Sequence, residues 1–201
     1  MHIAEGVLSP AILVGGALLT AGGTAMGLKR LRHEDLMLVA LMAAAFFVAS
    51  LVHVPIGPTS AHLILNGALG MLLGWGAFPA ILMGLALQAL FFQYGGLTVL
   101  GINTWNMAAP AVLLGILCRP WVLRPGQART IAAFVCGFGS VLGAGLLTAL
   151  SLTFTDEGFL RAAQVLFLAH VPVAAAEGVL TALLVRFLAR VRPETFGIVS
   201  S

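Results

Sequence analysis

Charged residues are scarce in this chain of 201 residues. Only 8% are Asp, Glu, Lys or Arg, whereas 60% are hydrophobic, and the mean hydropathy is +1.07. Average soluble chains carry about 25% charged residues, so this chain has too little charge to cover a water-facing surface. Intrinsic disorder is excluded as well, because it requires low hydrophobicity and high net charge. The composition therefore predicts an all-α integral membrane protein.

Motifs of several other functions are also missing. The only lysine of the chain, Lys29, is followed by Arg30. The sequence therefore lacks the Gly-Lys-Ser/Thr end of a phosphate-binding loop, and we expect no ATP site in it. Cys-x-x-Cys, His-Glu-x-x-His and Gly-x-Ser-x-Gly are absent, and nothing indicates an enzyme. No basic run interleaved with aromatics indicates a nucleic acid partner. Cys118 and Cys136 lie in apolar runs, which predicts free thiols.

Apolar runs predict seven transmembrane helices, since a spanning helix needs about 20 mostly apolar residues. The runs cover residues 10–28, 36–52, 61–75, 79–94, 107–117, 131–154 and 159–191. The last run exceeds one bilayer crossing, so we expect it to kink at Pro172 or to begin outside the hydrocarbon core.

Basic residues indicate how the chain is oriented. Seven crossings would place nine of the ten on one side, and Arg161 alone on the other. Because cytoplasmic loops carry an excess of Lys and Arg, we expect the N-terminus outside and the C-terminus in the cytoplasm. The nine are Lys29, Arg30, Arg32, Arg119, Arg124, Arg129, Arg186, Arg190 and Arg192.

The first two residues form a possible metal-binding segment. A bulky His2 should block removal of Met1, leaving a terminal amine. That amine, the His2 backbone nitrogen and the His2 Nδ1 atom can close five- and six-membered chelate rings in one plane. Planar nitrogen donors suit Cu(II) or Ni(II), which need one more nitrogen. The alternative is a surface histidine near a frayed terminus.

His62 is the second candidate ligand. It follows a Gly/Pro-rich loop and enters an apolar run, where an ionisable residue indicates function by default. The alternative is a helix that begins here, with Thr59 or Ser60 as N-cap and His62 in its first turn. We expect His62 on the same outer side as His2, in a position to meet it.

Further polar and small residues are candidates for supporting roles. Asn103 and Asn106 fall outside the membrane, where they would orient ligating imidazoles or satisfy their own loop backbone. His170 and Glu177 share a helix face, and Glu177 needs a buried partner or forms part of a path.

Span one carries a stripe of small residues, Ala17, Ala21 and Ala25. Small residues at this spacing allow close helix contact, either inside the protein or with another subunit.

Four segments together resemble the CbiM/NikM family. They are Met-His-Ile-x-Glu-Gly at 1–6, Gly-Pro-Thr-Ser-Ala-His at 57–62, the Gly-Gly-Leu-Thr…Asn-x-x-Asn-Met run at 95–107, and His-Val-Pro with Glu-Gly at 170–178. Members are substrate-capture components of energy-coupling factor transporters for cobalt or nickel. The resemblance implies seven helices, an outside N-terminus tucked into the protein, and metal ligation by Met1, His2 and His62.

The resemblance also carries expectations about substrate and partners. Cobalt-type members show Ser-His-Pro-Thr-Gly around the loop histidine, whereas this chain has Ser-Ala-His-Leu-Ile at 60–64, which looks like the nickel type. We expect Ni²⁺ as the transported substrate, with Co²⁺ uptake for cobalamin synthesis as the alternative. Ser60, Asn103 and Asn106 are expected to support the ligands.

Expected partners are a transmembrane coupling subunit, an ATP-binding subunit and a small accessory membrane subunit, in a bacterial or archaeal plasma membrane. Residues 1–9 would form the metal-binding segment, 10–191 the bundle and 192–201 a cytoplasmic tail of one membrane domain. Two other classes remain as alternatives. One is a membrane scaffold without a metal, and the other is a free-standing secondary carrier.

Overall fold

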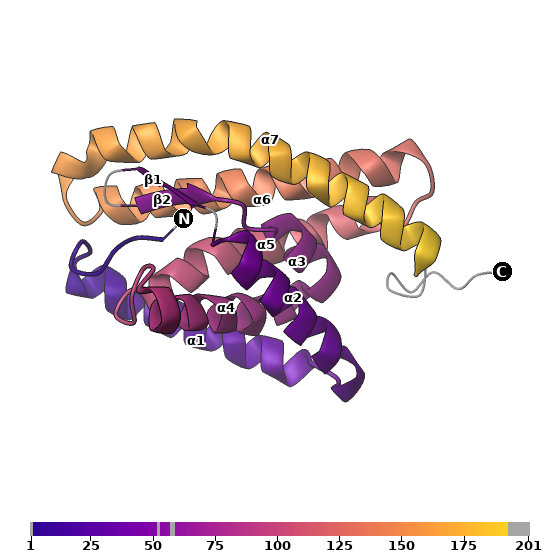
Figure 1. Ribbon diagram of the computed structural model, residues 1–201, viewed down its shortest axis with the longest axis horizontal. Coiled ribbons are helices and arrows are strands. Elements are labelled where there is room, and N and C mark those ends of the chain that lie inside the picture. Colours follow the sequence, from indigo (N-terminus) through magenta and orange to yellow (C-terminus); the bar gives the residue numbers. More distant parts are fainter. Residues whose placement is uncertain (1, 52, 57–58, 193–201) are drawn as a thin grey trace.

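A computed structural model describes residues 2–51, 53–56 and 59–192, with only the backbone considered at 53–56 and 59–62. These residues form a helical bundle with a two-stranded hairpin at one end (Figure 1). The helices are α1 (Pro10–Arg30), α2 (Leu36–Ala49), α3 (Asn66–Leu73), α4 (Ala77–Phe92), α5 (Leu100–Val122), α6 (Gln127–Thr153) and α7 (Leu160–Val191). The antiparallel strands are β1 (His53–Ile56) and β2 (Thr59–His62). Short 3-10 turns occupy His33–Asp35, Gly74–Gly76 and Glu157–Phe159.

The prediction of seven transmembrane helices is wrong. Five segments of the described chain are long and apolar enough to cross a membrane: Pro10–Arg30, Asn66–Phe92, Leu100–Val122, Gln127–Thr153 and Glu157–Val191. The second predicted span shrinks to α2, whose 14 residues extend only about 21 Å. The third is interrupted, because residues 59–62 pair as a strand and α3 has only 8 residues. A helical, multi-pass membrane protein remains consistent with this arrangement.

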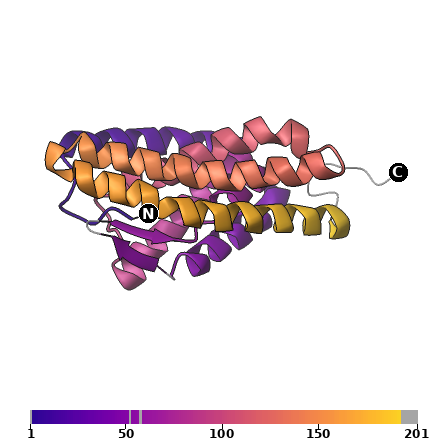
Figure 2. The ribbon, with the colours of Figure 1, turned by 90° about the horizontal axis from the view of Figure 1, so that it is seen from above.

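The longest helix continues through its proline. α7 spans 32 residues with Pro172 inside, and it runs beside α6 along the long axis in both Figure 1 and Figure 2. At 1.5 Å per residue, α7 is about 48 Å long, so it extends beyond a hydrocarbon core of about 30 Å. The helix therefore stays continuous at Pro172, and its length agrees with the alternative that part of it lies outside the core.

Small residues bring the helices close together. The buried face of α1 consists of Gly16, Thr20, Gly23 and Gly27. A Cβ atom added at Gly16 would overlap Ile102 of α5, and one at Gly70 of α3 would overlap the Ala111 carbonyl of α5. The predicted stripe of Ala17, Ala21 and Ala25 is largely exposed, although the backbone of Ala17 lies close to Gly101 of α5.

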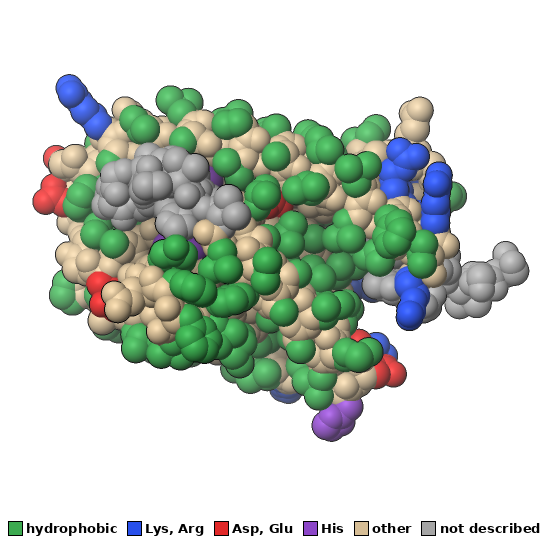
Figure 3. Space-filling model, in the orientation of Figure 1, with side chains coloured by type: hydrophobic (Ala, Val, Ile, Leu, Met, Phe, Trp, Pro, Cys, Tyr) green, Lys and Arg blue, Asp and Glu red, His purple; other side chains and the backbone are tan. Residues whose placement is uncertain are grey.

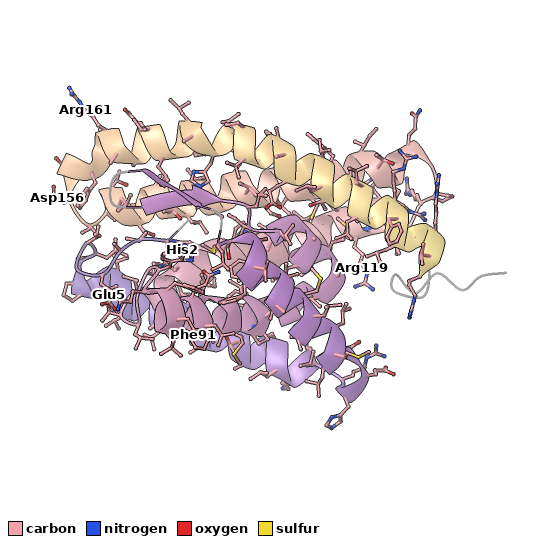
Figure 4. The ribbon with its side chains drawn as sticks, in the orientation of Figure 1. His2, Glu5, Phe91, Arg119, Asp156 and Arg161 are labelled. Carbon is pink, nitrogen blue, oxygen red and sulfur yellow. The ribbon has the colours of Figure 1, made fainter. Side chains whose placement is uncertain are left out.

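Surface chemistry separates the two ends of the bundle. Basic residues occupy the last turns of α1, α5 and α7, and Figure 3 shows Lys and Arg side chains gathered at one end. Arg161 and Asp156 lie at the other end, near the N-terminus (Figure 4). Large apolar side chains such as Leu18, Met37 and Phe91 are exposed on the sides, as expected of lipid-facing positions. Cys118 and Cys136 are buried free thiols, as predicted.

Gly70 provides a test of this packing. We expect Gly70→Ala to destabilise the protein by about 2–4 kcal/mol, since the new methyl group meets a rigid backbone carbonyl. Thermal unfolding of the purified protein in detergent measures the change. Gly22→Ala is the matched control, because nothing lies within 4 Å of its added Cβ. Equal melting temperatures for the two variants would contradict the close approach of α3 and α5.

Candidate functional site

The N-terminal segment is buried in the bundle. The His2 side chain is only 6% exposed and Ile3 is fully buried. Ile3 packs in a cluster with Leu8, Val99, Ile102, Leu152 and Leu166, which joins the segment to α5, α6 and α7. The alternative of a surface histidine on a frayed terminus therefore does not hold. Figure 4 shows His2 among the helices, away from the basic end.

Gln88 of α4 orders the His2 ring. Its side-chain nitrogen donates to the Phe47 carbonyl at 3.1 Å and also to the Ser50 hydroxyl, so its oxygen must face His2. That oxygen lies 2.7 Å from His2 Nε2 and can only accept, so Nε2 carries the proton. In a neutral ring, Nδ1 then keeps its lone pair. A hydrogen bond to the other ring nitrogen is how proteins orient metal-binding histidines.

Asn103 of α5 holds the backbone next to His2. The Ile3 N–H donates to Asn103 Oδ1 at 3.1 Å, and Asn103 Nδ2 donates to the Ile3 carbonyl at 3.2 Å. Asn103 thus pairs with both backbone groups of Ile3, as a neighbouring β-strand would. The described bonds of its side chain go to this backbone and not to an imidazole. Asn106 donates to Ser151 of α6 at 3.2 Å and joins two helices.

The loop before α5 closes over the same segment. A Cβ atom at Gly95 would come within 3.1 Å of Asn103 and 3.5 Å of His2, and one at Gly96 would overlap Glu5. Both glycines also have positive φ angles, which side-chain-bearing residues rarely adopt. Glu5 Oε1 accepts from the Thr98 N–H at 3.0 Å and from its hydroxyl at 3.2 Å. The Thr98 N–H lowers the pKa of the exposed Glu5 carboxyl, because it stabilises the charged form.

Met1 and His62, two of the predicted ligands, are not fully included in the described part of the chain. Met1 lies outside the described residues, as do the side chains of Ser60 and His62. The His62 backbone ends β2, paired with His53 of β1. The alternative of a helix starting at Thr59 or Ser60 is wrong, because α3 begins only at Asn66.

Glu177 of α7 anchors the connection between β2 and α3. Its Oε1 atom accepts hydrogen bonds from the Ile64 N–H and, at 2.7 Å, from the Leu65 N–H. Leu65 has a φ of +56°, an unusual conformation for a branched side chain. The carboxylate therefore fixes the chain two residues after His62.

Sequence reasoning missed Gln88 entirely. The signal was present, because Gln88 is an amide in the middle of the apolar run 79–94, where a polar side chain needs a partner. Elsewhere, no three His, Cys, Asp or Glu side chains gather as a metal site among the described residues.

The apolar helices define the class of this chain as a multi-pass helical membrane protein. Residues 2–195 match the family described as "CbiM: Cobalt uptake substrate-specific transmembrane region". The chain belongs to this CbiM family.

Several relatives share nearly the whole chain. A "Putative metal transport protein" of Haemophilus influenzae is 43% identical over 96% of both chains. A "Fused nickel transport protein NikMN" of Rhodobacter capsulatus is 33% identical over 96% of this chain and 63% of the relative. The "Cobalt transport protein CbiM" of Salmonella typhimurium is 32% identical over 92% of this chain and 82% of the relative. A solved transition metal transporter matches with a TM-score of 0.81 and 28% identity, over 95% of this chain and 93% of its own.

The hydrogen bond between Gln88 and His2 can be tested directly. We expect Gln88→Leu to lower stability by about 1–3 kcal/mol, because the buried His2 N–H loses its acceptor. Ring ¹⁵N shifts of His2 should show a single Nε2–H tautomer in the wild type and a mixture in the variant. Gln164→Leu changes an exposed glutamine of α7 and is the matched control. An unchanged tautomer in Gln88→Leu would contradict this role.

Proposed function

We propose that the chain captures Ni²⁺ at the outer membrane face, as the substrate-binding subunit of an energy-coupling factor importer. The observation that carries this proposal is the buried His2 ring, whose Nε2–H is fixed on Gln88 so that Nδ1 keeps a lone pair. Family membership supports a transition metal as the substrate, and related proteins are named for nickel or cobalt transport.

The proposed ligands are four nitrogens in one plane. They are the Met1 amine, the His2 backbone nitrogen, His2 Nδ1 and the His62 imidazole. Four nitrogen donors in one plane suit the square-planar coordination of Ni(II). This match in coordination geometry supports nickel over cobalt as the substrate. Asn103 and Glu5 support the set by holding the segment that supplies three of these nitrogens. Ser60 and Asn106 remain candidates for a supporting role, Asn106 through the α5–α6 contact.

The distribution of charge supports the direction of capture. The N-terminal site lies at the end opposite the basic last turns of α1, α5 and α7. Because basic residues favour the cytoplasmic side, the basic end faces inward and His2 faces outward. In this arrangement residues 1–9 bind the metal, 10–191 form the bundle, and 192–201 form a cytoplasmic tail.

Partners must supply the energy. The sequence has no phosphate-binding loop, so a separate subunit would hydrolyse ATP. A coupling subunit in the membrane and a small accessory subunit complete the proposed importer. Relatives named as fused NikMN and fused CbiMQ support an assembly of several parts. The exposed stripe Ala17, Ala21 and Ala25 offers a close-packing helix face for the coupling subunit.

Displacing the terminal amine tests the proposed site. We expect one residue added before Met1 to weaken nickel binding by about 100-fold, or about 2.8 kcal/mol. The same loss is expected for His2→Ala and His62→Ala, measured by nickel titration of the untagged protein. His33→Ala, in the exposed turn after α1, is the matched control. Unchanged affinity in the extended protein would reject this site, and full uptake by both histidine variants would favour a scaffold. Competition between Ni²⁺ and Co²⁺ decides the preferred ion.

Nickel affinity should also depend on pH. Loss of the His2 amide proton on binding makes affinity rise with pH, by about tenfold per pH unit for each proton released. The rise is expected between about pH 6 and about pH 8. Glu5 does not contribute there: its pKa is lowered from 4.5, so its anchor is present above that value and is lost only as pH falls below it. Glu5→Ala should therefore keep the same slope, and a flat profile would exclude amide ligation.

A further inference from the structure

Buried polar atoms without partners concentrate between three helices. Six buried side-chain atoms in the described part of the chain accept or donate no hydrogen bond, and five of them lie on α3, α6 and α7. Their side chains are at most 1% exposed. The five atoms are Asn66 Oδ1, Ser140 Oγ, His170 Nε2, Glu177 Oε2 and Thr181 Oγ1. We call these five residues the polar seam.

Glycine contacts align the seam along the α6–α7 interface. A Cβ atom at Gly145 of α6 would meet the His170 ring at 3.5 Å. At Gly137, two turns earlier in α6, it would meet the Thr181 hydroxyl at 2.6 Å and the Glu177 carbonyl at 2.7 Å. The two helices therefore run antiparallel with these polar residues between them.

Helix α3 joins the seam at its first residue. The Glu177 carboxylate binds the backbone of the two residues before Asn66. Gly67 packs directly against Gly137 of α6. Asn66 thus begins α3 at the level of Glu177, and its own amide nitrogen donates to the Met107 carbonyl at 3.1 Å.

The seam leads from the outer end into the membrane. From His170 to Thr181, α7 rises about 16 Å, roughly half of a hydrocarbon core. α7 also contacts the hairpin that carries His62. Past Thr181, the same helix leads to Arg190 in its last turn at the basic end.

The atoms of the seam can present lone pairs to a cation. His170 Nδ1 lies 2.7 Å from the Leu166 carbonyl, which only accepts, so Nδ1 carries the proton and Nε2 keeps its lone pair. Glu177 Oε2 and Asn66 Oδ1 are oxygen acceptors as well. Leaving such atoms unpaired destabilises a folded protein, so their concentration at one interface indicates a function.

We propose that the polar seam is a path of weak, successive binding positions for the divalent metal ion, which passes along it from the outer site towards the basic end. The proposal rests on the proposed function, since it needs a metal ion to be delivered. One carboxylate among neutral donors binds weakly, which suits a passing ion that must leave again. Glu177 lies between the proposed outer site and the seam. Its Oε1 atom accepts from the chain that follows His62, whereas its Oε2 atom has no partner and is part of the seam.

Thr181→Val separates transport from stability. Valine has nearly the same shape and removes an unpartnered hydroxyl, so the melting temperature should stay equal or rise. Nickel uptake should be measured in cells that make the whole importer with this variant in place of the wild-type chain. The rate should fall by about tenfold, the effect typical of losing a group that supports the ligands of a metal site. The nickel Kd of the purified full chain should stay within about twofold of wild type, because the outer site is intact.

Thr20→Val is the matched control, because the Thr20 hydroxyl is buried in α1 but donates to the Gly101 carbonyl at 2.6 Å. It should leave uptake near the wild-type rate per folded molecule. Full uptake in Thr181→Val, or an equal loss in both variants, would overturn the proposal and leave the seam a packing feature. Failure of the outer site is distinguishable, because it removes nickel binding itself in the variant extended before Met1.

Discussion

The burial of His2 and Ile3 inside the bundle is the constraint on which the structure around them depends. A free chain end is polar and is normally solvated, yet here residues 2 and 3 are buried in a helical bundle. Each polar group in that segment needs a partner within the protein. Gln88 satisfies the ring, Asn103 satisfies the Ile3 backbone, and Thr98 holds Glu5. The terminus thereby becomes a rigid part of the fold, with the lone pair of its imidazole on a defined nitrogen.

That constraint explains the unusual local structures around the terminus. Gly95 and Gly96 lie against His2 and Glu5, where any side chain would collide. The chain from β2 to α3 takes a left-handed turn at Leu65, fixed by the Glu177 carboxylate. The predicted third span is accordingly replaced by a hairpin and a helix of only 8 residues.

Sequence reasoning reached the membrane class and the family more readily than the contacts around the N-terminal segment. The membrane class follows from composition, and His2 follows from the donor geometry of a free terminus. The number of spans did not follow, because hydropathy does not distinguish an apolar hairpin and half-helix from a crossing helix. Asn103 was expected either to orient a ligating imidazole or to satisfy its own loop backbone, whereas it binds the Ile3 backbone across 100 positions of sequence. Gln88 was missed because its meaning depends on Phe47 and Ser50, which only the folded bundle brings beside it.

The contrast between two polar regions connects structure with transport. Around His2, several polar groups are paired within the protein, which suits a site that must hold an ion in fixed geometry. Among α3, α6 and α7, five buried side-chain atoms are left without partners. In the proposed function, the first region captures the ion and the second is a route that binds it weakly. Glu177 belongs to the second region, and its other oxygen holds the chain after His62. A tight site alone would retain its ion, since an ion crosses a membrane only if each successive site also releases it.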